Sequence, residues 1–127
     1  MQPCNLTIIT SIDGEESVFS TDGEMELSPQ SASICYTQED SSVHILIKNA
    51  RISIERTGGY VLRLDLEKNK AIGGVVGLPG AEGRIEATAH KIGYTVKEKS
   101  LLLSAKYTLR FDSGAQDMSI RLIARGK

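Results

Sequence analysis

The stretch VHILIKNARISIERTGGYVLRLDLE, residues 43–67, decides the fold of this chain. Apolar side chains occupy every second position in three segments, which is the pattern of strands with one buried face. These apolar positions are Val43, Ile45, Ile47, Ile52, Ile54, Leu62, Leu64 and Leu66. Residues 48–51 and 57–59 break the pattern, and the Asn and Gly there tolerate the positive φ that tight hairpin turns require. The stretch therefore predicts three consecutive antiparallel strands.

The same alternation continues on both sides of this meander. Further strands are predicted over residues 5–13, 17–27, 32–37, 101–111 and 118–124. Asp22-Gly23 interrupts the second of these and predicts either a second turn or a bulge. Many short strands with frequent turns and almost no helix are typical of a sandwich or a closed barrel. Connections between neighbours favour an all-β, antiparallel, mostly up-and-down closed barrel of roughly eight to ten strands, in one domain spanning residues 1–127.

The segment 71–92 is less regular. It holds five glycines, which weaken any long strand, so we expect a short strand followed by a mobile loop near the mouth of the barrel. Residues 84–91 alternate apolar and polar side chains and favour a strand. A helix over 81–92 is the alternative, because four apolar residues there are spaced by three or four positions. These are Ala81, Ile85, Ala89 and Ile92.

Charge is unevenly distributed along a chain whose net charge is −1. This small net charge argues against strong nonspecific attraction to nucleic acid or to an anionic membrane. Residues 1–50 carry eight acidic and one basic residue, whereas residues 84–127 carry nine basic and four acidic ones. Barrel closure would bring the two ends together, so we expect mutual compensation across neighbouring strands. A basic binding surface is the alternative.

Cys4 and Cys35 are the two cysteines, too few for a disulfide framework in a chain of 127 residues. We expect reduced thiols. The first residues lack the basic segment and apolar run of a signal peptide, and no stretch approaches the roughly 18 apolar residues of a membrane span. A soluble, cytoplasmic protein is therefore expected.

Motifs for chemistry are sparse. The glycines between 73 and 83 match neither of the common phosphate-binding patterns, and we expect no cofactor. His44 and His90 occur without a second ligand at metal-binding spacing, so no dedicated metal site is predicted. Glu24 and Glu26 share one strand face, where a solvated surface is the simpler interpretation than paired acid/base chemistry. An enzyme is the third hypothesis, since the sequence predicts no catalytic residues.

The chain also resembles a known family, the small bacterial proteins typified by YwiB. The similarity runs nearly end to end, and five segments carry it. They are the opening strand with residues 13–16 (DGEE), residues 34–39 (ICYTQE), the hairpin from Val43 to Gly58, the Leu62-Arg63 strand, and residues 78–86 (LPGAEGRIE). The resemblance implies a calycin-like (lipocalin-like) β-barrel. Barrels of that kind often bind small apolar molecules, which makes lumen binding an expectation by analogy of fold.

The candidate site is the barrel lumen. Strand parity predicts that Tyr36 and Tyr107 point inward and that Arg63 and Arg84 point outward. The expected lumen residues are Tyr36, Leu62, Leu64, Tyr107, Leu109 and Leu122, and the expected mouth loop holds Gly74, Gly77, Pro79 and Gly80. The leading hypothesis is a nonenzymatic barrel binding a small apolar or amphipathic ligand.

Two alternatives remain open for the interior and the surface. A barrel of this size can be filled by its own side chains, in which case both tyrosines belong to a solid core. The protein would then act as an interaction module, whose partner would be a protein or RNA. Its binding face would be basic and formed by Lys106, Arg110, Arg121 and Arg125.

Overall fold

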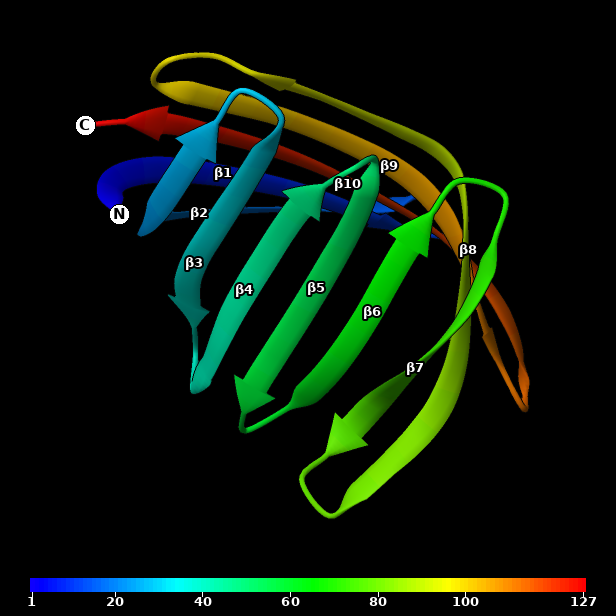
Figure 1. Ribbon diagram of the computed structural model, residues 1–127. Helices are drawn as coiled ribbons and strands as arrows, with labels where there is room; N and C mark the ends of the chain where they lie inside the picture. The colour runs from blue at the N-terminus through cyan, green and yellow to red at the C-terminus, as the bar shows by residue number, and fades with distance from the viewer.

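Ten antiparallel strands form the computed structural model, which describes residues 1–127 (Figure 1). The strands are β1 (Gln2–Ile12), β2 (Glu15–Ser28), β3 (Ser31–Gln38), β4 (Ser41–Lys48), β5 (Arg51–Gly58), β6 (Val61–Glu67), β7 (Ala71–Leu78), β8 (Ala81–Val96), β9 (Ser100–Phe111) and β10 (Gly114–Gly126). Each strand pairs with the next, and β1 pairs with β10 to close the barrel. The prediction of an all-β, up-and-down closed barrel is confirmed.

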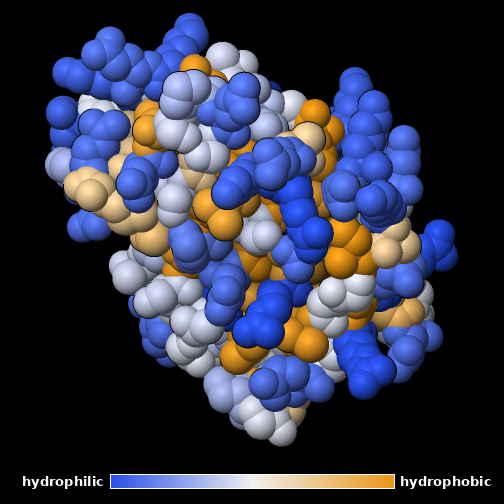
Figure 2. All heavy atoms as spheres, in the orientation of Figure 1, coloured by the Kyte–Doolittle hydropathy of each residue, from blue (hydrophilic) through white to orange (hydrophobic).

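The central meander forms as its sequence pattern predicts. Ile45 lies opposite Ile54, and Ile54 lies opposite Leu64, so apolar side chains align across β4, β5 and β6 on the inner face. Asn49 and Ala50 both have positive φ, 54° and 61°, as a two-residue hairpin turn of the favoured hand requires. The outer face of the same strands is mostly polar, as Figure 2 shows.

Two seams of the barrel are held by few strand pairs. β2 and β3 pair over five positions, and β6 and β7 over three, compared with eight between β4 and β5. The strands β3 to β6 therefore form one continuous wall, visible as four aligned arrows in Figure 1, and the other six strands form the second wall. At the first seam Gly23 of β2 lies close to β3, and an added Cβ there would lie 2.6 Å from the Cys35 carbonyl oxygen.

The segment 71–92 differs from part of its prediction. A short strand followed by a loop was expected, and the strand is longer than expected: β7 includes Gly73 to Gly77 and ends in a tight Pro79-Gly80 turn. The helix alternative over 81–92 is wrong, because β8 is extended from Ala81 to Val96. Asp22-Gly23 lies within the single strand β2 and forms no second turn.

The two ends of the barrel are packed differently. The packed end holds both termini and the hairpins β2–β3, β4–β5, β6–β7 and β8–β9 (Figure 1). Side chains there are fully buried, among them Met25, Ile47, Ile52 and Leu66. The Tyr94 hydroxyl accepts a hydrogen bond from the Ala50 backbone N–H at 3.2 Å and so ties β8 to the β4–β5 hairpin. The opposite end, formed by the hairpins β1–β2, β3–β4, β5–β6, β7–β8 and β9–β10, is called the open end below.

No helix of the structure is long and apolar enough to span a membrane.

Candidate functional site

A cavity of about 380 Å³ lies in the lumen toward the open end. Eight of the ten strands contribute to its wall, and 13 of its 17 lining residues are hydrophobic. The hydrophobic lining residues are Ile8, Ile12, Val18, Phe19, Tyr36, Val43, Ile45, Ile54, Leu62, Leu64, Tyr107, Met118 and Ile120. The polar ones are Thr10, Ser17, Gln38 and Arg56. The lumen is thus hollow at one end and not filled throughout by side chains.

Several side chains that line the cavity keep a small exposed area. On β5, Ile52 near the packed end is 0% exposed, whereas Ile54 beside the cavity is 6% exposed. Tyr107 and Ile120 on the opposite wall are also 6% exposed. These side chains alternate along their strands as a buried face requires.

Four of the six predicted lumen residues line this cavity. They are Tyr36, Leu62, Leu64 and Tyr107. The remaining two, Leu109 and Leu122, are buried in the core but lie outside the cavity wall. The predicted mouth residues are also outside it: Gly74 and Gly77 lie within β7, and Pro79 and Gly80 form the turn at its end.

The two arginines with predicted orientations lie on the outer surface. Arg63 Nη2 is 3.7 Å from Glu55 Oε1, and the Arg63 side chain is 66% exposed. Arg84 is exposed as well. Strand parity predicts both orientations correctly.

Arg56 is a charged lining residue that the sequence patterns did not single out. It is the only charged residue in the cavity wall, and its Nε is buried without a hydrogen-bond partner. Its Cζ lies 5.5 Å from the centre of the Tyr60 ring, within the range of a cation–π interaction. The signal was present in the sequence, because Arg56 follows Ile52 and Ile54 at a spacing of two.

Both tyrosines of the cavity are held in the neutral form. Burial raises the pKa of Tyr107 to about 12. Burial also raises the pKa of Tyr36, and the nearby positive charge of Arg56 partly opposes this shift. At neutral pH both hydroxyls therefore carry their protons and can donate hydrogen bonds into the cavity.

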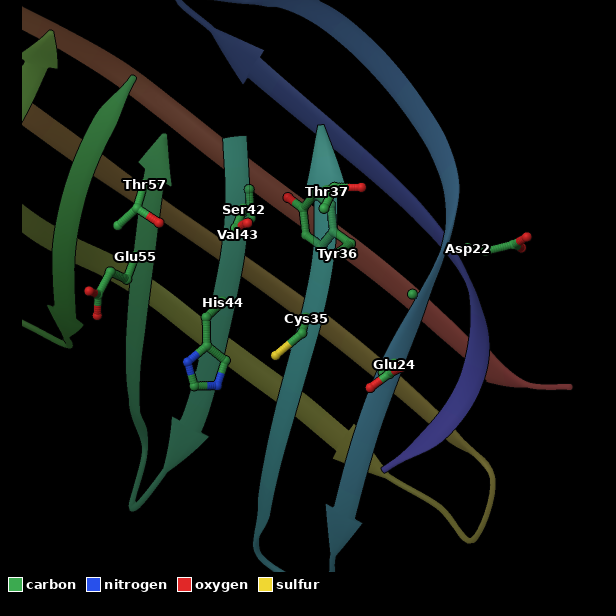
Figure 3. Close-up of a pocket in the computed structure, with 11 residues that line it drawn as sticks. Asp22, Glu24, Cys35, Tyr36, Thr37, Ser42, Val43, His44, Glu55 and Thr57 are labelled. Atoms are coloured by element: carbon green, nitrogen blue, oxygen red, sulfur yellow. The ribbon is translucent and has the colours of Figure 1, made fainter. Parts of the chain in front are cut away.

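A second hollow, of about 530 Å³, lies on the outer surface beside the β2–β3 seam (Figure 3). Glu24, Cys35, His44 and Glu55 form a row across β2, β3, β4 and β5, because each is the register partner of the next. Figure 3 shows these four side chains on neighbouring strands. This row brings together the residue types that nucleophilic catalysis could use.

The chemistry of the row does not favour a reactive thiol. Desolvation by burial raises the pKa of Cys35, and the negative charge of Glu24 raises it further, so the thiol stays protonated at neutral pH. His44 Nε2 is hydrogen-bonded to Ser33 Oγ at 2.7 Å. No three His, Cys, Asp or Glu side chains of the protein are placed to hold a metal ion.

Four basic side chains lie on the outer face of β9 and β10: Lys106, Arg110, Arg121 and Arg125. All are exposed, and no carboxylate lies within 4 Å of them. The ends of the chain do lie side by side, but one ion pair joins them, between Lys127 Nζ and Asp22 Oδ2 at 3.0 Å. Of the compensation expected across neighbouring strands, the structure shows this one ion pair.

Comparison with known proteins identifies relatives of this chain. A family model described as "Domain of unknown function (DUF1934)" matches residues 5–122. The crystal structure of the ywiB protein from Bacillus subtilis is similar, with a TM-score of 0.85 and 14% identity, over 99% of this chain and 92% of that one. No curated protein matches the chain. At 14% identity the structural similarity shows a shared fold alone.

Proposed function

This chain belongs to the DUF1934 family, a family of domains of unknown function, and we propose that it is a nonenzymatic barrel that binds a small apolar or amphipathic ligand in its lumen. The observation that supports the proposal is the cavity at the open end, with its 13 hydrophobic lining residues and few polar groups. Ligand sites commonly combine an apolar wall with a few oriented polar groups.

The cavity volume limits the size of the ligand. At about 380 Å³ it lies near the lower end of the roughly 300–1,000 Å³ typical of small-molecule sites. Binding would remove apolar ligand surface from water, at roughly 25 cal/mol per Å². The architecture also resembles calycin-like barrels that use their lumen in this way, although analogy of fold is the weaker support.

A catalytic role has less physical support than binding. The ionisable groups that line the cavity are Arg56, Tyr36 and Tyr107. An arginine stays charged, and both tyrosines stay protonated at neutral pH because burial raises their pKa. None of the three can therefore act as a general base near pH 7.

The proposal is tested by filling the cavity with a larger side chain. Met118 is half-buried and lines the cavity, so Met118→Trp should occupy ligand space. We expect wild-type protein to bind the neutral fluorescent probe N-phenyl-1-naphthylamine saturably, and Met118→Trp to bind it at least about 10-fold more weakly, as several lost apolar contacts would cause. Fluorescence titration measures both affinities.

Leu46→Trp is the matched control, because Leu46 lies on β4 beside the lining residue Ile45 but is 39% exposed. It should bind the probe as wild type does. Equal weakening by both variants, or no saturable binding to wild type, would contradict lumen binding.

A second candidate function is an interaction module that uses the four basic residues of β9 and β10. The observation that favours it is that these four side chains are exposed and have no acidic partner within 4 Å. Binding of RNA or an acidic protein through this face would weaken steeply as salt increases. Binding of a neutral ligand in the lumen would not, which separates the two candidates.

We also infer a cytoplasmic location. Cys4 is buried and Cys35 is half-buried, and both are free thiols. Free thiols are typical of proteins in reducing compartments.

A further inference from the structure

The lumen cavity presents hydrogen-bond donors that have no partner within the protein. Arg56 Nε is the only buried side-chain nitrogen or oxygen without a hydrogen bond. The hydroxyls of Tyr36 and Tyr107 also take part in none of the side-chain hydrogen bonds of the structure. A buried polar atom normally has a partner, so Arg56 Nε marks a site that lacks its acceptor, and the two tyrosine hydroxyls of the same cavity are free to bind the same ligand.

Arg56 also forms no ion pair within the protein. Its guanidinium has no carboxylate within 4 Å, and its Cζ lies 5.5 Å from the centre of the Tyr60 ring. Arg56 also lines a hollow at the open end with Glu39 and Asp40, which are too far away to pair with it directly. An arginine half-buried in a mostly apolar wall is costly unless a negative group approaches it. No other cavity-lining residue carries a charge, so the wall has a net charge of +1.

The donors fit one kind of ligand group. Arg can only donate hydrogen bonds, and the two tyrosine hydroxyls keep their protons at neutral pH. A carboxylate can only accept, and its two oxygens match the planar guanidinium. A single arginine neutralises a monoanion, whereas a dianionic phosphate would keep a net negative charge in an apolar cavity.

We propose that the lumen binds an amphipathic monoanion whose carboxylate is held by Arg56 with Tyr36 beside it, and whose apolar tail lies against residues such as Ile54, Leu64 and Ile120. This inference rests on the proposed lumen binding and names its ligand class.

Acidic residues at the open end oppose the approach of such a ligand. Its first two hairpins carry Asp13, Glu15, Glu16, Glu39 and Asp40, all exposed. Because exposed charges are screened by salt more than half-buried ones, their repulsion should fade as salt rises while Arg56 keeps most of its attraction. Carboxylate binding should therefore persist at physiological ionic strength.

The test compares decanoate with 1-decanol, which have the same tail and differ in the charge of the head. Isothermal titration calorimetry at pH 7.5 measures both affinities for wild type, Arg56→Met and Arg63→Met. We expect wild type to bind decanoate at least about 10-fold more tightly than 1-decanol, since charge-assisted hydrogen bonds contribute that much or more. Arg56→Met should lose this preference while it keeps its affinity for 1-decanol.

Arg63→Met is the matched control, because Arg63 is the register neighbour of Glu55 on the outer face and points away from the lumen. It should behave as wild type. Equal affinities of wild type for both compounds, or an unchanged preference in Arg56→Met, would overturn the carboxylate site and leave lumen binding intact. Failure of wild type to bind either compound would overturn both proposals.

Discussion

Arg56 is a charged side chain at a position where the alternation of β5 otherwise places isoleucines. Parity alone assigns it to the lumen, two residues after Ile54. The sequence did not reveal its role, because a charge next to the Thr57-Gly58-Gly59 turn is also what an exposed hairpin end looks like. To decide between a lumen residue and an exposed hairpin residue, one must know that the lumen is hollow at the level of Arg56. The inward orientation of Tyr36 and Tyr107 was easier to predict, since each lies on a clearly apolar strand face.

Ionisation of Tyr107 should lower the stability of the protein at alkaline pH. Its pKa is raised to about 12 from an ordinary value of 10.0, so the folded state binds this proton more tightly than the unfolded state does. The resulting stability is fully present below about pH 10 and is lost as pH rises through about 12. Relative to Tyr107→Phe, the free energy of unfolding of wild type should fall by roughly 2–3 kcal/mol across this range, as urea denaturation would measure.

Tyr60→Phe is the control for this titration, because Tyr60 is 39% exposed. Its stability should follow that of wild type at every pH. If the free energy of unfolding changes with pH in the same way for wild type and Tyr107→Phe, then Tyr107 ionises normally and is not buried in the lumen wall.

The residue spacing in strand β8 imitates that of a helix and so misleads a prediction made from the sequence. Its inward residues Ile85, Ala87 and Ala89 alternate strictly, but the register with β9 shifts between Ala89 and Lys91. One extra residue at this bulge moves the next inward position to Ile92. The spacing of Ala89 and Ile92 therefore becomes three, which imitates a helix. A bulge leaves no distinctive residue in the sequence, whereas the regular strands 43–67 and 101–111 were predictable.

In β7, the backbone contact at Gly74 requires glycine, whereas the neighbouring position Gly73 has open space. A Cβ on Gly74 would lie 2.3 Å from the Arg63 carbonyl oxygen, whereas a Cβ on Gly73 would meet nothing within 4 Å. We expect Gly74→Ala to lower the free energy of unfolding by about 1–3 kcal/mol, because β7 must move away from β6 at a seam of three strand pairs. Thermal or urea unfolding measures the loss.

Gly73→Ala is the paired control on the same strand. It should be neutral or slightly stabilising, because alanine restricts the unfolded chain and meets no neighbour in the fold. If both variants lose the same stability, close contact at the β6–β7 seam is not the reason for glycine in β7.

At the scale of the whole molecule, the barrel is asymmetric along its axis. Fully buried side chains fill the end that holds both termini, and the cavity lies toward the end with the acidic hairpins. Alternation in the sequence predicts which side chains point inward. It does not predict the volume between them, because that volume depends on how two walls, joined by short seams at β2–β3 and β6–β7, are spaced. The closed barrel was therefore predictable, and its hollow half was not.

The central claim is that a ligand enters this hollow half, and methyl NMR of isoleucine-labelled protein tests it most directly. Four of the five isoleucines that line the cavity are buried: Ile8, Ile45, Ile54 and Ile120. Three others, Ile34, Ile47 and Ile52, lie in the core but outside the cavity wall, and Ile9 is register partner to outward Arg121. On addition of 1-decanol we expect saturable shifts of the first four methyl signals and little change in the others. Shifts concentrated at Ile9, or none at the four buried lining residues, would contradict a ligand-binding lumen.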